Sequence, residues 1–90
     1  MTRDAESTVD LHGLDRAAAI RRLEQALHTA RVRGAATLLV VTGRGFGNRE
    51  QRPVLRTHVE AWLAGPDGRR QGVVAVRTTS RGGALELRLR

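Results

Sequence analysis

Length and composition restrict the chain to one small, folded and strongly basic domain. Its 90 residues suit a single hydrophobic core and are too few for two. Sixteen arginines and no lysine stand against nine acidic residues, which gives a net charge of +7. Such a charge favours a polyanionic partner, and nucleic acid is the first candidate. A hydrophobic content of 40% excludes a disordered chain, and no apolar stretch approaches the roughly 20 residues of a membrane helix.

Residue types that the sequence lacks exclude further classes of protein. Without cysteine there is no disulfide framework, thiolate metal site or cysteine nucleophile. Phe46 and Trp62 are the only aromatic residues, too few for modules that stack successive bases on rings, such as RNA-recognition motifs and oligonucleotide-binding barrels. The first residues carry no apolar signal segment. We therefore expect a cytoplasmic protein that is monomeric and has no membrane partner.

The first half of the chain predicts a strand, a helix and a second strand. Residues Thr8–Leu11 alternate between polar and apolar and suit a short strand that ends at Gly13. Asp15 is a candidate N-cap for an amphipathic helix that extends to Arg33, where Gly34 ends it. The aliphatic run at 38–41 is typical of a central strand buried on both faces.

The second half predicts a helix followed by a hairpin. Pro53 suits the first turn of a helix whose apolar stripe continues until Gly65 and the following proline stop it. Val73–Arg77 and Ala84–Leu89 are predicted to be strands. The glycine-containing stretch between them, 80–83, favours an antiparallel hairpin.

These elements define the expected fold class, an α/β two-layer sandwich with the order βαβαββ. It has a mixed four-stranded sheet and two helices, preceded by a tail at 1–7, so that the domain occupies 8–90. A right-handed crossover makes the first two strands parallel neighbours. Ligands of such sheets gather at the carboxyl ends of the strands, where two polar motifs of this chain are expected to meet.

The first of these motifs contains Asp10 and His12. Two residues apart on an extended segment, their side chains leave the same face. An imidazole transfers protons near neutral pH, and a neighbouring carboxylate orients the ring, raises its basicity or holds a divalent ion. The alternative is that Asp10 caps a turn and His12 packs beneath the loop.

The second motif is a glycine-rich loop that begins at Thr42. Its glycines allow backbone amides to approach a phosphate, and Arg44 adds a five-donor guanidinium. The spacing matches neither the ATP-binding nor the dinucleotide-binding fingerprint. The alternative is a connector whose glycines only satisfy turn geometry. The candidate phosphate-binding residues are Thr42, Gly43, Arg44, Gly45, Gly47, Arg49 and Arg52.

Three segments together resemble the small MutS-related (Smr) domain family over about residues 7–90. They are Val-Asp-Leu-His-Gly-Leu at 9–14, Leu-Val-Val-Thr-Gly-Arg-Gly at 39–45 and Arg-Gly-Gly-Ala-Leu-Glu-Leu-Arg-Leu at 81–89. Asp10 and His12 match the Asp-Leu-His-Gly motif of that family, and 43–45 match its His-Gly-Lys-Gly motif. Thr42 stands where the family has histidine, and Arg44 keeps the positive charge of the lysine. The resemblance implies a fold similar to the C-terminal domain of bacterial translation initiation factor three, and nicking of DNA or cleavage of RNA.

The sequence thus predicts an endonuclease that cuts DNA or RNA with little sequence specificity. Arg44 and the glycine amides would hold the phosphate, while Asp10 orients His12 for proton transfer. No metal-ligating residue is assigned, and a divalent ion such as Mg or Mn is compatible with the sequence without being required by it. The alternative function is a non-catalytic module that binds branched DNA, structured RNA or ribosomes. The choice between DNA and RNA stays open.

Overall fold

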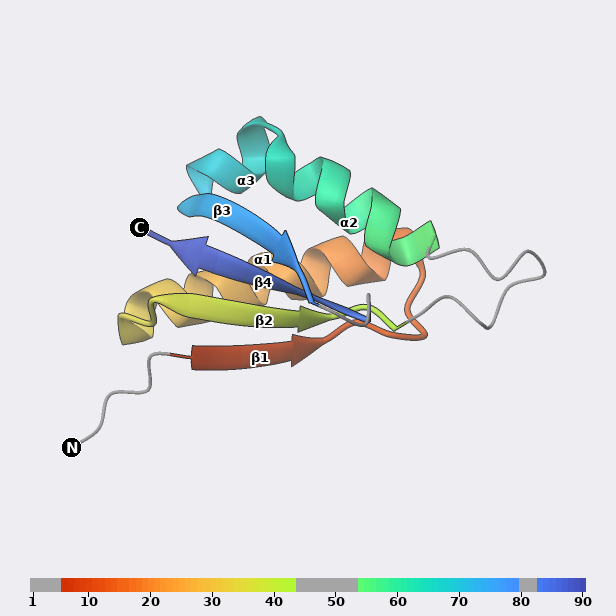
Figure 1. The fold of residues 1–90 in the computed structure, drawn as a ribbon, viewed down its shortest axis with the longest axis horizontal. Coiled ribbons are helices and arrows are strands. Elements are labelled where there is room, and N and C mark those ends of the chain that lie inside the picture. Colours follow the sequence, from red (N-terminus) through yellow and green to blue (C-terminus); the bar gives the residue numbers. More distant parts are fainter. Residues whose placement is uncertain (1–5, 44–53, 80–82) are drawn as a thin grey trace.

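The structure is a computed structural model that describes residues 6–43, 54–79 and 83–90. Its elements are the strand β1 (Glu6–Asp10), the helix α1 (Arg16–Arg33) and the strand β2 (Thr37–Val41), followed by two helices and two strands. The later elements are α2 (Val54–Ala64), α3 (Pro66–Arg70), β3 (Val73–Thr78) and β4 (Ala84–Leu89). Within the described ranges the helices cover one face of a four-stranded sheet (Figure 1). The predicted α/β two-layer sandwich is confirmed.

The sheet has the strand order β1-β2-β4-β3. β1 and β2 are parallel, with Asp10 beside Val41, so the predicted crossover is confirmed. β4 is antiparallel to both β2 and β3, which confirms the hairpin pairing. The carboxyl ends of β1 and β2 therefore lie side by side, and the segments that follow them leave the sheet together.

The helix α1 forms where the apolar spacing and the caps predict it. A carboxylate oxygen of Asp15 accepts a hydrogen bond from the Ala18 amide at 2.8 Å, which satisfies one of the free donors at the helix start. Gly34 ends the helix with φ +74°, a left-handed conformation that glycine adopts without steric cost. The buried stripe consists of Ala19, Leu23, Leu27 and Ala30.

Two sequence-based predictions about the strands are wrong in detail. β2 is buried on one face only, because Leu38 and Val40 face the helices while Leu39 and Val41 are partly buried on the other side. The strand is aliphatic on both faces although a single helical layer covers it. β1 begins at Glu6, two residues before the predicted start, because its pairing with β2 extends to Thr37.

A short helix that the sequence did not predict, α3, follows α2 directly. Gly65 and Pro66 do end α2. Proline has no amide hydrogen, but an amide at the first helical position would have no partner within the helix. Pro66 can therefore begin a new helix. Gly68 in α3 is buried against the backbone of Leu63 at the end of α2. Pro53, the predicted start of α2, lies outside the described residues.

Candidate functional site

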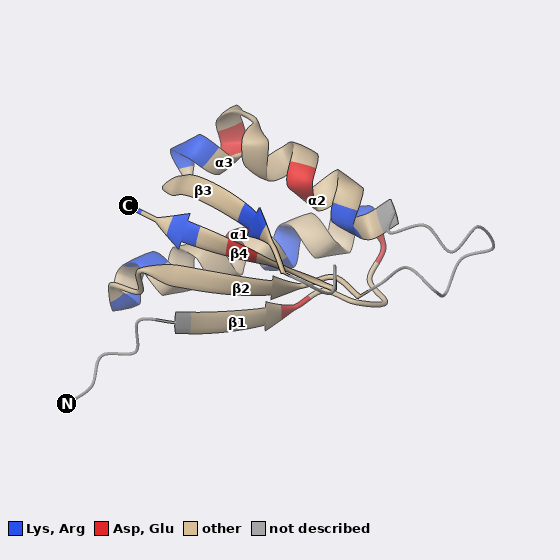
Figure 2. Cartoon of the chain, in the orientation of Figure 1, with Lys and Arg blue, Asp and Glu red and all other residues tan. Residues whose placement is uncertain are grey.

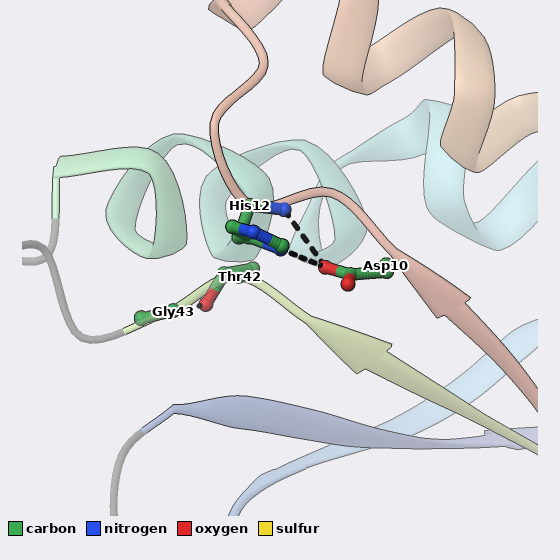
Figure 3. Close-up of polar contacts among 4 residues, drawn as sticks. All are labelled: Asp10, His12, Thr42 and Gly43. Carbon is green, nitrogen blue, oxygen red and sulfur yellow. Dashed lines mark hydrogen bonds and ion pairs between the residues drawn. The ribbon is translucent and has the colours of Figure 1, made fainter.

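Two predicted motifs meet at the carboxyl ends of β1 and β2. Figure 3 shows Asp10 at the end of β1, His12 in the turn that follows, and Thr42 with Gly43 just beyond β2. Leu11, between the two polar residues of the first motif, is fully buried and donates its amide hydrogen to the Val41 carbonyl at 2.7 Å. This anchor holds the chain while the side chains on either side of it stay exposed.

Asp10 and His12 form a close pair. The Nδ1 atom of His12 lies 2.6 Å from Oδ1 of Asp10, and the same oxygen accepts the His12 backbone amide at 3.1 Å (Figure 3). Asp10 therefore caps this turn, as the structural alternative predicted. The second half of that alternative is wrong, because the His12 side chain is 67% exposed and the Asp10 side chain 53%.

The hydrogen bonds determine the protonation state of Asp10 and the tautomer of His12. Donation from the His12 ring, and then from its amide, lowers the pKa of Asp10 below 3.8. An ionised carboxylate only accepts hydrogen bonds, so we assign the hydrogen of a neutral His12 ring to Nδ1. The Nε2 atom then carries the free lone pair. The ring can thus accept a proton at Nε2 while Nδ1 stays hydrogen-bonded to Asp10.

Thr42 and Gly43 are engaged in hydrogen bonds within the fold. Thr42 is buried, and its hydroxyl donates to the Gly43 carbonyl at 3.3 Å. The amides of both residues donate to the Gly83 carbonyl at 3.0 Å, which ties the end of β2 to the start of β4. A phosphate cradle cannot use the Gly43 amide without breaking this bond. The remaining predicted phosphate-binding residues, Arg44, Gly45, Gly47, Arg49 and Arg52, lie outside the described residues.

Gly43 has a further reason for its position. Its φ is +81°, and a Cβ atom added there would lie 3.4 Å from Cβ of His12. That distance is at the inner limit of ordinary contact, so glycine lets the backbone after β2 pass close to the histidine. Nothing in the sequence signals this proximity to His12, since the glycine suggested only an approach to phosphate.

One arginine on α1 acts on the site, and another contacts α2. The positive charge of Arg22 contributes to lowering the pKa of Asp10, though less than the His12 hydrogen bonds. At the start of α1, Nη1 of Arg16 lies 3.5 Å from Nδ1 of His58 on α2. Figure 2 shows that basic and acidic residues are interspersed around this end of the described structure. Sequence spacing gives no signal for these contacts, because they depend on how α1 packs against β1 and α2.

The described residues show neither a metal-binding cluster nor a membrane-spanning helix. They contain no cluster of three or more His, Asp or Glu side chains arranged to hold a metal ion. None of the helices in these ranges has the length and apolar character needed to cross a membrane.

Comparison with known proteins agrees with the motifs. The family model of the Smr domain matches residues 9–89. The crystal structure of the Smr domain of Thermus thermophilus MutS2 is similar, with a TM-score of 0.75 and 31% identity over 93% of this chain and 98% of that one. The solution structure of the B3BP Smr domain has a TM-score of 0.60 and 26% identity over 92% of this chain and 77% of that one. No curated protein matches. Since the family model spans nearly the whole sequence, the chain belongs to the Smr domain family.

Proposed function

We propose that this Smr domain is an endonuclease that cleaves the phosphodiester backbone of nucleic acid. The observation that carries the proposal is the 2.6 Å contact between Asp10 Oδ1 and His12 Nδ1 on an exposed edge of the sheet. A carboxylate that orients an imidazole is a general acid–base arrangement. The net charge of +7 supports a polyanionic substrate.

RNA suits this pair better than DNA. With Nδ1 bonded to Asp10, Nε2 of His12 would take the proton of a ribose 2′-hydroxyl, whose oxygen attacks the neighbouring phosphorus. The bond to the 5′-oxygen breaks and that oxygen takes a proton from water, which leaves a 2′,3′-cyclic phosphate and a 5′-hydroxyl. This route needs no metal ion. DNA lacks the internal nucleophile, so a water molecule would have to attack instead.

The experiment measures cleavage of a hairpin RNA and of a matched DNA by the purified chain, with and without EDTA. We expect RNA cleavage that persists in EDTA, leaves cyclic phosphate ends and stops when one 2′-deoxy sugar replaces the ribose at the cut. Loss of a general acid or base slows a reaction by about 10² to 10⁴-fold, which is the fall expected for His12→Ala and His12→Gln. Asp10→Asn should cost less, because Asp10 acts by orienting the ring.

A matched control is His28→Ala, which removes another exposed histidine, on α1. Its cleavage rate should equal that of the wild type. Cleavage by a contaminating nuclease would instead be unchanged in every one of these variants. Full cleavage by the Asp10→Asn, His12→Ala double variant would refute the catalytic assignment. Cleavage abolished by EDTA, with a larger loss in Asp10→Asn than in His12→Ala, would assign Asp10 to a metal ion instead.

Thr42 supports a second candidate, a module that binds nucleic acid without cutting it. The family motif has histidine at this position, whereas here the buried threonine hydroxyl donates to the Gly43 carbonyl. A mechanism that needs two imidazoles is therefore not available from this pair of motifs. Salt-sensitive binding of RNA or DNA by a wild-type chain that cuts neither would favour this second function.

A further inference from the structure

The outer edge of β1 and the adjoining face of α1 form a groove that the proposed cleavage does not use. β1 is an edge strand, and no described strand pairs with its outer side (Figure 1). The groove has a volume of about 460 Å³ and is lined by β1, α1 and Leu38 of β2. One wall therefore consists of strand backbone and the other of helix side chains.

The backbone of β1 presents hydrogen-bonding groups to this groove. The Leu11 amide points toward β2, where it donates to the Val41 carbonyl. Since successive residues of a strand point their amide and carbonyl groups to opposite sides, those of Thr8 point away from β2. An edge of this kind is a template for one more strand.

The side chains of the groove are apolar at the base and basic at both ends. Val9, Ala26, Ala30 and Leu38 supply its apolar surface. Arg22, Gln25, Thr29 and Arg33 recur at three- and four-residue intervals and form a polar rim along α1. Among the described residues, none that lines the groove is acidic. The two arginines are three turns apart, about 16 Å along the helix axis.

We propose that this groove binds an extended acidic peptide, which adds a strand to the outer edge of β1. In a strand, every second side chain faces the same side, and residues four apart are separated by about 13 Å. Acidic residues at the first and fifth positions would reach Arg22 and Arg33, and an apolar residue at the third would cover the apolar base. The motif is acid-x-apolar-x-acid. A single nucleic-acid strand suits the groove less well, because none of the described residues that line it has an aromatic ring for base stacking.

The test titrates a capped peptide, Ser-Glu-Thr-Val-Thr-Glu-Ser, into the ¹⁵N-labelled 90-residue chain and follows the backbone amides by NMR. We expect saturable shifts at residues 7–10 and along the rim of α1. Exposed ion pairs are worth up to about 1 kcal/mol, which is a fivefold change in Kd, and charge reversal adds repulsion. Arg33→Glu should therefore weaken binding by about fivefold or more. The peptide with both glutamates changed to glutamine should weaken similarly.

Two controls separate strand addition from general attraction between charges. Arg21→Glu reverses an exposed charge next to Arg22 in sequence but outside this groove, and should change Kd by less than about twofold. Peptides N-methylated at the valine or at the threonine after it should differ, because neighbouring amides point to opposite sides of a strand and only one can pair with β1.

Several results would overturn the proposal. They are the absence of saturable shifts, equal losses in Arg21→Glu and Arg33→Glu, or equal binding of the two N-methylated peptides. A ten-nucleotide single strand that shifts the same amides and displaces the peptide would assign the groove to nucleic acid. None of these measurements depends on cleavage, so the proposed nuclease activity and the proposed peptide binding are tested independently.

Discussion

Replacement of Gly43 by alanine tests whether this glycine positions His12. The residue has φ +81°, and a new Cβ would lie 3.4 Å from Cβ of His12. A non-glycine residue in the left-handed region costs about 1–2 kcal/mol. The chain can relieve this strain by moving the backbone that donates to Gly83, which carries the new Cβ past its contact with His12. We expect this movement to disturb the site.

The matched control is Gly34→Ala at the end of α1. Gly34 has φ +74°, and no heavy atom lies within 4 Å of an added Cβ. The two substitutions therefore carry similar backbone strain, and only one adds a contact with the site. Each should destabilise the fold by about 1–2 kcal/mol, which lowers Tm by roughly 4–16 °C in a domain of this size. Urea and thermal denaturation measure this part of the prediction.

The two variants should differ at the site. In Gly43→Ala the 2.6 Å contact between Asp10 and His12 is expected to lengthen, so the pKa of Asp10 should rise toward 3.8. In Gly34→Ala the pKa of Asp10 should equal that of the wild type. Carboxyl ¹³C titration by NMR measures this pKa without any assumption about catalysis. An unchanged pKa in Gly43→Ala, or equal changes in both variants, would refute the positioning role of the glycine.

Three further predictions concern packing, electrostatics and substrate binding. Gly68→Ala should destabilise the fold by about 2–3 kcal/mol in urea denaturation, because an added Cβ would lie 2.1 Å from the Leu63 carbonyl oxygen; a loss below 1 kcal/mol would contradict this packing. His12→Ala should raise the pKa of Asp10 only part of the way to 3.8, because the backbone amide still donates; a pKa that stays at its wild-type value in carboxyl titration would disprove the ring's contribution. If Arg44 contacts phosphate, the affinity for duplex should fall with salt concentration at a log–log slope of about −0.9 per phosphate contact. Arg44→Glu should then reduce both the affinity and the slope. An unchanged slope would show that Arg44 does not contact phosphate.

The low pKa of Asp10 determines how the site responds to acid. A carboxyl whose folded pKa lies below its unfolded value stabilises the fold fully above the unfolded pKa, and loses this contribution as pH falls through the folded pKa. For Asp10 the loss is complete only below pH 3.8. Asp10 thus stays ionised across the neutral range. Its negative charge is consequently present beside His12 at neutral pH.

Local patterns predicted the helix α1 and the family. The caps at Asp15 and Gly34 and the apolar spacing between them depend only on neighbours within a few turns, so they are readable from sequence. The three motifs indicated the Smr domain, which the family model then matched. α3 was missed, since a proline can either end a helix or begin one, and the buried contact of Gly68 with Leu63 belongs to tertiary packing.

By itself, the sequence determined that one basic α/β domain forms, that its first two strands are parallel, and that Asp10 and His12 leave the same side of the chain. Only the tertiary structure decided which partners those side chains have. The single helical layer leaves one face of β2 partly exposed. The end of β2 brings Gly43 close to His12. The packing of α1 places Arg22 near Asp10 and beside the free edge of β1. Periodicity in a sequence reports which face of an element is apolar. The distance between elements depends on packing, which brings together residues far apart in the chain.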